Sequence, residues 1–379
     1  RLGLLSGIVA LMVGVLTFPL SLLADRWGRV RSLTLMATLW SVATLACGLA
    51  RNYEEMFVAR LFVGIGEAAY GSVGVAVVLS VFPARMRATI TSAFMAGGVF
   101  GSVLGMAAGG ILAQHFGWRW SFVGMALFGL SLAAMYPLVV RQSRVATSSL
   151  RARAIGPVPT LSPLATLFAT RSVITAYVGS GLQLFVGGSL IAWMPSYLNR
   201  YYHMAADRGG ALAAVLVLCS GAGMIICGLI SDRICRNSPA RKVSLAIALC
   251  LLCCVLLSVA FHLSAGPLQL ALIAAGMFVA AGTAGPSGAM VANLTHLSIH
   301  GTAFATLTLA NNLLGLAPGP FLTGVLADAT DLQHALQLVP LVSVLAAGAF
   351  LAGKMHYARD LERIGSAVIA AGDTGGRHA

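Results

Sequence analysis

The stretch Asp25-Arg26-Trp27-Gly28-Arg29-Val30-Arg31 lies between two apolar runs that are each long enough to cross a lipid bilayer. Three arginines and an aspartate gather here around a single glycine. So short a connection leaves no room for a soluble domain, and its cations favour the cytoplasmic side of a membrane. The stretch therefore predicts a tight cytoplasmic turn between two membrane-spanning helices.

The composition places the whole chain in the same class. Of its 379 residues, 58% are hydrophobic and 9% are charged, whereas soluble globular proteins carry about 25% charged residues. The net charge of +13 is spread over loops between apolar runs, without interleaved aromatic residues, so it indicates membrane topology and argues against a nucleic-acid partner. We expect an all-α polytopic membrane protein that lies in the lipid bilayer as a monomer.

Eleven apolar runs qualify as spans, because a helix needs about 20 apolar residues to cross a hydrocarbon core of about 30 Å. The runs lack the alternating pattern of outer-membrane strands, so helices are expected throughout. The expected spans are residues 3–24, 32–50, 56–81, 89–113, 121–140, 173–198, 209–231, 243–262, 267–291, 300–326 and 335–356.

The arginines and lysines fix the expected orientation and the domain boundaries. They concentrate after the first, third, fifth and seventh runs and in the tail, so these loops and the C-terminus are expected on the cytoplasmic side of an inner membrane. The proline-containing stretch 141–171 predicts a cytoplasmic linker between an N-terminal bundle, residues 1–140, and a C-terminal bundle, residues 172–356. The glycine-containing tail, residues 357–379, is expected to be disordered.

The two halves of the chain repeat each other. The dipeptide Asp25-Arg26 returns as Asp232-Arg233, 207 positions later, and the glycine spacing of residues 101–110 returns in residues 315–324, 214 positions later. Two matches at similar offsets predict two pseudo-symmetric helical bundles that arose by duplication.

Glu67 lies near the middle of an expected span, and Arg60 lies inside the same span. A charge at the bilayer centre costs about 2.5–3.5 kcal/mol, so such residues usually mark an ion or substrate pathway. Seven residues make about two helical turns, which puts both side chains on one face, about 10.5 Å apart. The placement favours Glu67 as a proton-binding group and Arg60 as a substrate contact; the alternative is a structural pair satisfied by neighbouring helices.

Further polar residues interrupt the apolar spans. They could line the same cavity as Arg60 and Glu67, although hydrogen bonding between helices explains each of them equally well. These candidates for the substrate and coupling network are Tyr70, Gln183, Asn311 and Asn312.

The sequence offers little support for a different class of protein. His296 and His300 have a spacing that can bind zinc on a helix, which leaves a membrane metalloenzyme as an alternative. No carboxylate or cysteine lies beside them, and we expect no metal site. The chain has no glycine-rich phosphate loop and no nucleophile elbow, so neither an enzyme nor a cofactor is expected. A non-transporting membrane sensor is the other alternative.

Three motifs resemble those of the major facilitator superfamily. Ser21-x-x-x-Asp25-Arg26-x-Gly28-Arg29-x-Arg31 is similar to its signature loop, with Ser21 in place of the usual glycine. Arg60-x-x-Val63-Gly64-x-Gly66-x-Ala68-Ala69 is similar to its fourth-helix motif, and Phe116-Gly117-Trp118-Arg119-Trp120-x-Phe122 resembles the loop before its sixth helix. The stretch Gly64–Tyr70 resembles the spinster-like transporters and the organic anion:cation symporters.

The resemblance implies a fold of two helical bundles and twelve spans; the eleven spans expected here would correspond to the second to the twelfth, and the family's first helix is expected to be missing from this sequence. It also implies a secondary transporter in which the bundles rock about a site at the membrane midplane, with Glu67 in proton coupling and Arg60 in substrate contacts. The main hypothesis is proton-coupled transport of a small organic, anionic solute; the alternative is export of amphipathic lipids or drugs. The gating loops would be those of Asp25, Arg26, Gly28, Arg29 and Arg31 and of Asp232 and Arg233.

Overall fold

The computed structural model describes residues 2–68, 70–139, 167–168, 170–235, 240–295 and 299–375. These residues form helices joined by short turns, and no β-strand occurs among them. The prediction of an all-α protein is confirmed. Most of the predicted linker, residues 141–166, lies outside the described residues.

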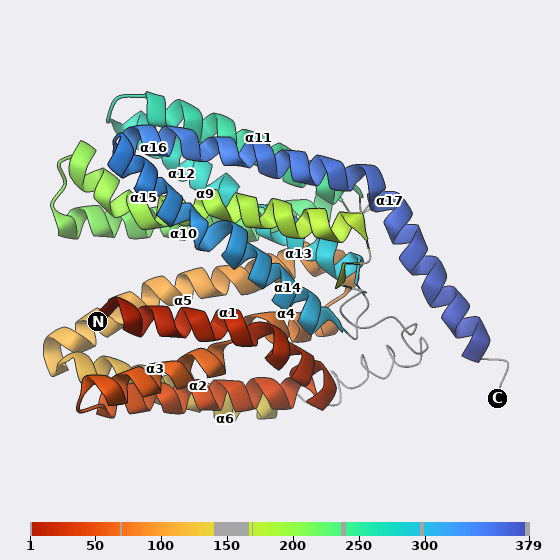
Figure 1. Ribbon diagram of the computed structural model, residues 1–379, viewed down its shortest axis with the longest axis horizontal. Coiled ribbons are helices and arrows are strands. Elements are labelled where there is room, and N and C mark those ends of the chain that lie inside the picture. Colours follow the sequence, from red (N-terminus) through yellow and green to blue (C-terminus); the bar gives the residue numbers. More distant parts are fainter. Residues whose placement is uncertain are drawn as a thin grey trace.

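The N-terminal bundle forms one layer of the molecule (Figure 1). Its described elements are α1 (Leu2–Trp27), α2 (Arg29–Leu49), α3 (Tyr53–Glu67), α4 (Tyr70–Val81), η1 (Ala84–Met86), α5 (Arg87–Phe116) and α6 (Trp118–Val139).

The C-terminal bundle forms the second layer, and α5 of the first layer packs against α10 and α13 of the second, while α1 and α4 pack against α14 (Figure 1). Its elements are α9 (Arg171–Tyr201), α10 (Ala206–Ile234), α11 (Ala240–His262), α12 (Pro267–Ala281), α13 (Ala284–Asn293), α14 (His300–Asn311), the π-helical turn η3 (Asn312–Leu316), α15 (Pro318–Ala329), α16 (Leu332–Leu338), η4 (Val339–Leu341) and α17 (Val342–Gly375).

The described helices account for all eleven expected spans. Nine helical stretches of the described residues are long and apolar enough to cross a membrane. The two others are α1, which is continuous from Leu2 to Trp27, and the span 300–326, which η3 divides into α14 and α15. The division by η3 shortens the continuous helices of the second of these spans without removing the span.

Glycines with positive φ make the tightest turns. Gly28 has φ 106° and separates α1 from α2, and Gly117 has φ 88° and separates α5 from α6. Residues with a side chain rarely adopt this conformation, so glycine is required at both turns. The loop that opened the sequence is thus a one-residue turn, and it brings the first two helices side by side.

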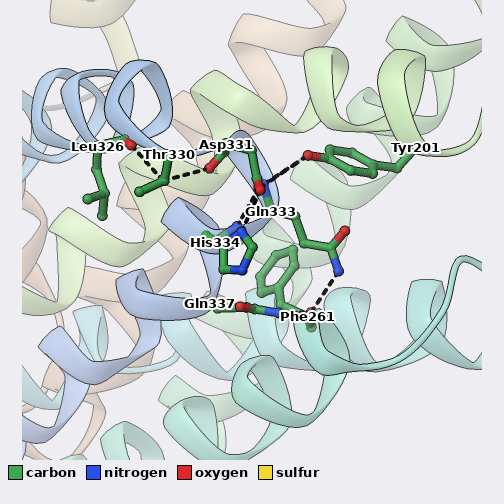
Figure 2. Close-up of polar contacts among 8 residues, drawn as sticks. All are labelled: Tyr201, Phe261, Leu326, Thr330, Asp331, Gln333, His334 and Gln337. Carbon is green, nitrogen blue, oxygen red and sulfur yellow. Dashed lines mark hydrogen bonds and ion pairs between the residues drawn. The ribbon is translucent and has the colours of Figure 1, made fainter.

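Elsewhere, polar side chains begin the helices. The Asn52 side chain accepts a hydrogen bond from the Glu55 backbone nitrogen, which caps α3, and the Glu55 carboxylate accepts one from the Arg51 nitrogen just before the helix. Asp331 caps α16 in the same way. It also accepts a bond from the Tyr201 hydroxyl, which ties the end of α9 to the corner between α15 and α16 (Figure 2).

The duplication is visible in the helix breaks. α3 ends at Glu67 and α4 begins at Tyr70, and α12 and α13 end and begin 214 positions later, at Ala281 and Ala284. This is the offset found for the repeated glycines. Helices α3–α4 and α12–α13 are therefore equivalent interrupted spans, one in each bundle.

The repeated glycines themselves have different surroundings in the two bundles. In the C-terminal bundle, a Cβ on Gly315 or Gly319 would lie 2.6 or 2.7 Å from backbone oxygens of α9, so only glycine allows this close approach. In the N-terminal bundle, no described atom lies within 4 Å of a Cβ placed on Gly101 or Gly105. The repeat is preserved in sequence, but only the second copy forms a tight helix contact within the described part of the chain.

The tail differs from the expectation of disorder after residue 356. Helix α17 continues to Gly375 and projects beyond the bundles (Figure 1). Before its glycines the tail contains alanine, arginine and glutamate, which favour helix and extend the preceding turn. Asp360 on this extension accepts hydrogen bonds from the Ser172 nitrogen and hydroxyl, which ties it to the start of α9.

Candidate functional site

Glu67 is the last residue of α3, directly before the break that separates α3 from α4. Its side chain is half-buried. Ala68, the next residue, still donates its backbone nitrogen to the Gly64 carbonyl at 3.0 Å, and α4 begins at Tyr70. The acidic residue predicted to carry protons therefore lies at the irregular point of its span.

Arg60 lies two turns before Glu67 and turns towards α6. Its guanidinium carbon is 5.5 Å from the centre of the Phe122 ring, a cation–π contact. Its Nε atom is buried and has no hydrogen-bond partner among the described residues. No ion pair between Arg60 and Glu67 occurs there either, as their separation of two turns led us to expect.

Tyr70, the first residue of α4, belongs to an aromatic cluster. Its ring centre lies 5.8 Å from that of Trp40 on α2 and 6.4 Å from that of Phe94 on α5. Tyr70 remains 38% exposed. A partly open aromatic surface thus lies within one turn of Glu67.

The polar candidates of the C-terminal bundle fall in two places. Gln183 on α9 is 1% exposed, and neither its amide nitrogen nor its amide oxygen has a hydrogen-bond partner among the described residues. It lies inside the bundle beside the Cys253 thiol of α11. Its burial places Gln183 within this bundle, whereas the sequence suggested that it lines a cavity shared with Glu67.

Asn311 and Asn312 lie where α14 turns into η3. The Asn312 side chain donates to the Thr308 carbonyl at 2.9 Å, and the Asn311 carbonyl oxygen Oδ1 is buried without a partner among the described residues. α4 runs from Tyr70 towards the Pro83 loop, while α14 runs from His300 in the opposite direction, and the two helices pack together. Twelve residues of each span about 18 Å, so Tyr70 and Asn311 lie at a similar depth.

The repeated Asp-Arg loops lie at one end of the bundles, which we call the arginine-rich end and define by Arg26, Arg31, Arg233 and Arg241. Gly28 makes the first turn there; Arg26, Arg31 and Arg233 are exposed, and Arg29 is half-buried. The side chain of Asp25 lies outside those that the structure describes.

Asp232 joins the two bundles at this end. Its carboxylate accepts hydrogen bonds from the backbone nitrogens of Ala88 at 3.2 Å and Thr89 at 2.7 Å, in the first turn of α5. Lys242 on α11 donates to the same carboxylate at 2.9 Å. The helix begins at Met86 without a side-chain cap of its own. A carboxylate of one bundle thus caps a helix of the other, where the helix dipole favours negative charge.

A second connection runs in the opposite direction. The Arg87 guanidinium donates to the Ala292 carbonyl at 3.2 Å and to the Asn293 side chain at 2.5 Å, at the C-terminal end of α13. In the sequence, Arg87 and Lys242 belong to the cation-rich loops after the third and seventh apolar runs, which indicated only the orientation of the chain in the membrane. An arginine in the first turn of a helix opposes the dipole of that helix, and this was the one signal that Arg87 serves a partner elsewhere.

Small residues complete the closure of this end. A Cβ on Gly285 of α13 would lie 2.2 Å from the Ser92 hydroxyl oxygen of α5, and one on Gly228 of α10 would lie 2.6 Å from it. A Cβ on Gly288 would lie 2.3 Å from a methyl carbon of Thr91. α5 therefore rests directly on the backbone of the other bundle, and the arginine-rich end is closed in this structure.

The proposed metal ligands give no support for a metal centre. The His300 imidazole is buried with its Nε2 atom 3.1 Å from the Ala292 carbonyl and 3.2 Å from the Thr295 carbonyl. His296 lies outside the described residues. No group of three or more histidine, cysteine or acidic residues placed to hold a metal occurs in the described part of the chain.

One groove of the described surface lies away from Glu67. It has a volume of about 720 Å³ and lies between α2 and α3, lined by aliphatic residues and Phe62, with Glu54 and Glu55 at one end. Among its side chains, Leu49 and Phe62 are exposed. The groove does not contain Glu67 or Arg60, so the polar site rests on the helix break instead.

Comparison with known proteins identifies the architecture. The family model described as Major Facilitator Superfamily matches residues 1–320. A probable L-galactonate transporter of Escherichia coli (strain K12) is 25% identical over 367 residues, which cover 92% of this chain and 79% of the relative. A putative metabolite transport protein of Haemophilus influenzae is 28% identical, over 85% of this chain and 79% of the relative.

Solved structures show the same fold at lower identity. The human organic anion transporter MFSD10 matches with a TM-score of 0.71 and 17% identity, over 92% of this chain and 83% of that chain. The proton:xylose symporter XylE matches with a TM-score of 0.66 and 17% identity, over 91% and 83%. A bacterial homologue of the human lysosomal transporter Spinster, inward-facing and occupied, matches with a TM-score of 0.64 and 19% identity, over 93% and 88%.

Proposed function

Because this chain belongs to the Major Facilitator Superfamily, whose members include secondary transporters of small solutes, we propose that it couples the movement of a small organic anion to that of protons. The observation that carries the proposal is the position of Glu67 at the end of an interrupted span, with Arg60 two turns away. An ionisable pair at membrane depth is retained where it serves transport.

The two interrupted spans suit an anionic solute. α4 and α13 begin at equivalent positions of the two bundles, and each begins within the membrane-spanning part of the chain. The N-terminus of a helix carries partial positive charge, so both starts favour an anion between the bundles. Arg60 adds a full positive charge on the N-terminal side.

The chemistry around the break fits a solute with several hydroxyl groups. Tyr70 and Trp40 supply aromatic surface for C–H groups, and Asn311 supplies an unpaired amide oxygen at a similar depth. A hydroxylated carboxylate such as a sugar acid would use both, and the relative from Escherichia coli is a probable L-galactonate transporter. We propose L-galactonate and related sugar acids as the first solutes to test.

Transport would proceed by rocking of the two bundles. In this structure the arginine-rich end is closed by Asp232, Arg87 and the glycine contacts of α5. From the positive-inside rule we propose that this end and the C-terminus face the cytoplasm, and we propose that the protein is a monomer in the inner membrane. Separation of the two bundles at this end would then release the solute into the cytoplasm.

The test uses the full-length protein in proteoliposomes. An inward proton gradient is imposed, and uptake of radiolabelled sugar acids is measured for the wild type and for Glu67→Gln. We expect gradient-driven uptake in the wild type and its loss in Glu67→Gln, with solute exchange in the absence of a gradient retained. Unchanged gradient-driven uptake in the variant would exclude the proposed coupling role. Transport of amphipathic compounds, with no competition by carboxylates, would favour an exporter instead.

A further inference from the structure

The break beside Glu67 is held by hydroxyl groups of α1. The Thr17 hydroxyl donates to the carbonyl oxygen of Ala68, the residue after Glu67, and also lies within hydrogen-bond distance of the Val13 carbonyl of its own helix. Thr17 is 2% exposed. Carbonyl groups at the end of a helix often take partners from outside that helix. Thr17 gives the Ala68 carbonyl a hydrogen bond from a neighbouring helix.

A second hydroxyl bonds to the other side of the break. Ser21 lies one turn after Thr17, on the same face of α1, and its oxygen is 2.6 Å from the Ser72 oxygen in the first turn of α4. Both serines are buried. We call Thr17 and Ser21 the α1 hydroxyl pair. The pair contacts the chain at Ala68, within the break, and at Ser72, in the first turn of α4, so it fixes the direction in which α4 begins.

The equivalent break in the C-terminal bundle has no such pair. With the offset of 207 that relates Asp25 to Asp232, the α10 counterparts of Thr17 and Ser21 are Met224 and Gly228. The break there packs against a thiol: a Cβ on Gly282 would lie 2.6 Å from the sulfur of Cys227. The Thr283 hydroxyl within this break donates to the Ala280 carbonyl at 3.2 Å, so the C-terminal break has a hydroxyl bond within its own span and no hydroxyl pair from α10.

The residue at the break differs in the same sense. The counterpart of Glu67 in the C-terminal bundle is Ala281, 214 positions later. Hydroxyl support from a neighbouring helix thus occurs at the break that carries a carboxylate, whereas the break that carries a methyl group has its hydroxyl bond within its own span. This difference points to a purpose of the pair beyond closing the helix end.

We propose that Thr17, assisted by Ser21, is a positioning residue for Glu67: its bond to the Ala68 carbonyl fixes the peptide next to the carboxylate, and so fixes where the carboxylate takes up and releases its proton. The proposal rests on the coupling role of Glu67 given above. The ionisable residues within two turns of Glu67 along its span are Arg60 on α3 and Tyr70 on α4; Cys47 on α2 interacts with Arg60, and α1 has no ionisable residue from position 2 to 24.

The test measures protonation of Glu67 directly and needs no transported solute. Purified full-length protein is treated with a hydrophobic carbodiimide, which modifies protonated carboxyl groups in apolar surroundings, and modification of Glu67 is measured by mass spectrometry between pH 5 and 9. We expect Thr17→Val to move the midpoint of this profile by about half a unit or more, because the variant is similar in shape and loses only the hydroxyl. Thr17→Ser should restore the wild-type midpoint.

The controls separate positioning from folding. Thr38→Val removes a hydroxyl that bonds within α2, to the Thr34 carbonyl, and should leave the midpoint unchanged. If Thr17→Val does not yield folded protein, Ser21→Ala, which leaves the Ala68 carbonyl bonded, should give a smaller shift in the same direction. The proposal is wrong if folded Thr17→Val has the wild-type midpoint. Because Glu67→Gln tests transport separately, failure of the coupling role can be told apart from failure of the positioning role.

Discussion

Replacement of Asp232 by asparagine should open the arginine-rich end of the protein. The carboxylate accepts two backbone hydrogen bonds from α5 of the other bundle, at 3.2 and 2.7 Å, and one bond from Lys242 of its own bundle. When the bundles separate, the bond to Lys242 persists, because α10 and α11 move together. Only the two bonds to α5 contribute to the equilibrium between closed and open states.

The magnitude follows from these two bonds. A hydrogen bond to a charged group contributes about 1.5–3 kcal/mol, and a charge at a helix N-terminus adds about 0.3–1 kcal/mol. Asparagine keeps one acceptor oxygen but loses the charge, and its amide cannot accept the second bond. With the carboxylate only 9% exposed, solvent weakens the interaction little. We expect a loss of about 2 kcal/mol, which is an increase of about 30-fold in the ratio of open to closed protein.

The assay reports exposure of a residue buried by closure. Thr91 is 1% exposed and faces Gly288 across the interface between the bundles, so Thr91→Cys introduces a thiol that a water-soluble maleimide reaches only after opening. The rate of labelling is proportional to the open fraction when opening is fast. Asp232→Asn in this background should be labelled about 30-fold faster than its parent, with the parent chain lacking Thr91→Cys as the blank.

Lys242→Met provides the matched control, because it removes the partner of Asp232 within one bundle and keeps both bonds to α5. This variant should melt at a lower temperature, since it leaves a buried carboxylate without its cation, while its labelling should not increase. Equal labelling of Asp232→Asn and its parent would refute the assignment of Asp232 as a contact that closes this end. Faster labelling of Lys242→Met would show that general loosening, not the lost cap, opens the interface.

Two further predictions concern the same interface and the opposite end. Gly285→Ala places a methyl carbon 2.2 Å from the Ser92 hydroxyl oxygen, and overpacking of this kind costs about 1–3 kcal/mol. Labelling at position 91 should therefore rise about 5- to 150-fold. The control Gly210→Ala, with no described atom within 4 Å of the added carbon, should have no effect on labelling. Backbone and side-chain hydrogen bonds from His334 lower the pKa of Asp331, so its stabilising contribution is complete above the ordinary aspartate pKa and is lost as the pH falls through the lowered value. The wild type should therefore melt slightly above Asp331→Asn at pH 6, and this difference should shrink below about pH 4; a constant difference would contradict the shift.

The helices and their order could be predicted because bilayer burial imposes a length and an apolar composition on each span. The break at Ala68 could not, since the stretch Arg60–Ser80 reads as one apolar run and lacks proline. The interruption depends on partners from another helix, which a local pattern does not contain. The same is true of Gln183: polarity predicted a cavity, but its face of α9 turns into the C-terminal bundle.

The sequence predicted one side of the contacts that close the arginine-rich end, but not their partners. The repeat of Asp25-Arg26 as Asp232-Arg233 identified the two loops and suggested that they have a common role. The partner of Asp232 is a set of backbone nitrogens on α5, and backbone groups leave no trace in a sequence. Lys242 and Arg87 looked like ordinary positive-inside residues for the same reason: the rule that explains their side of the membrane does not depend on what they touch.

The equivalent helix breaks of the two bundles share some features and differ in others. Both bundles interrupt an equivalent span, so the interruption belongs to the duplicated architecture. Glu67 and the α1 hydroxyl pair occur in one bundle, and Ala281 with the Cys227 contact occurs in the other. Hydroxyl groups support both breaks, since the Thr283 hydroxyl donates to the Ala280 carbonyl at 3.2 Å in the C-terminal bundle. The N-terminal break differs in two respects: it carries a carboxylate, and its hydroxyl support comes from a neighbouring helix and not from its own span.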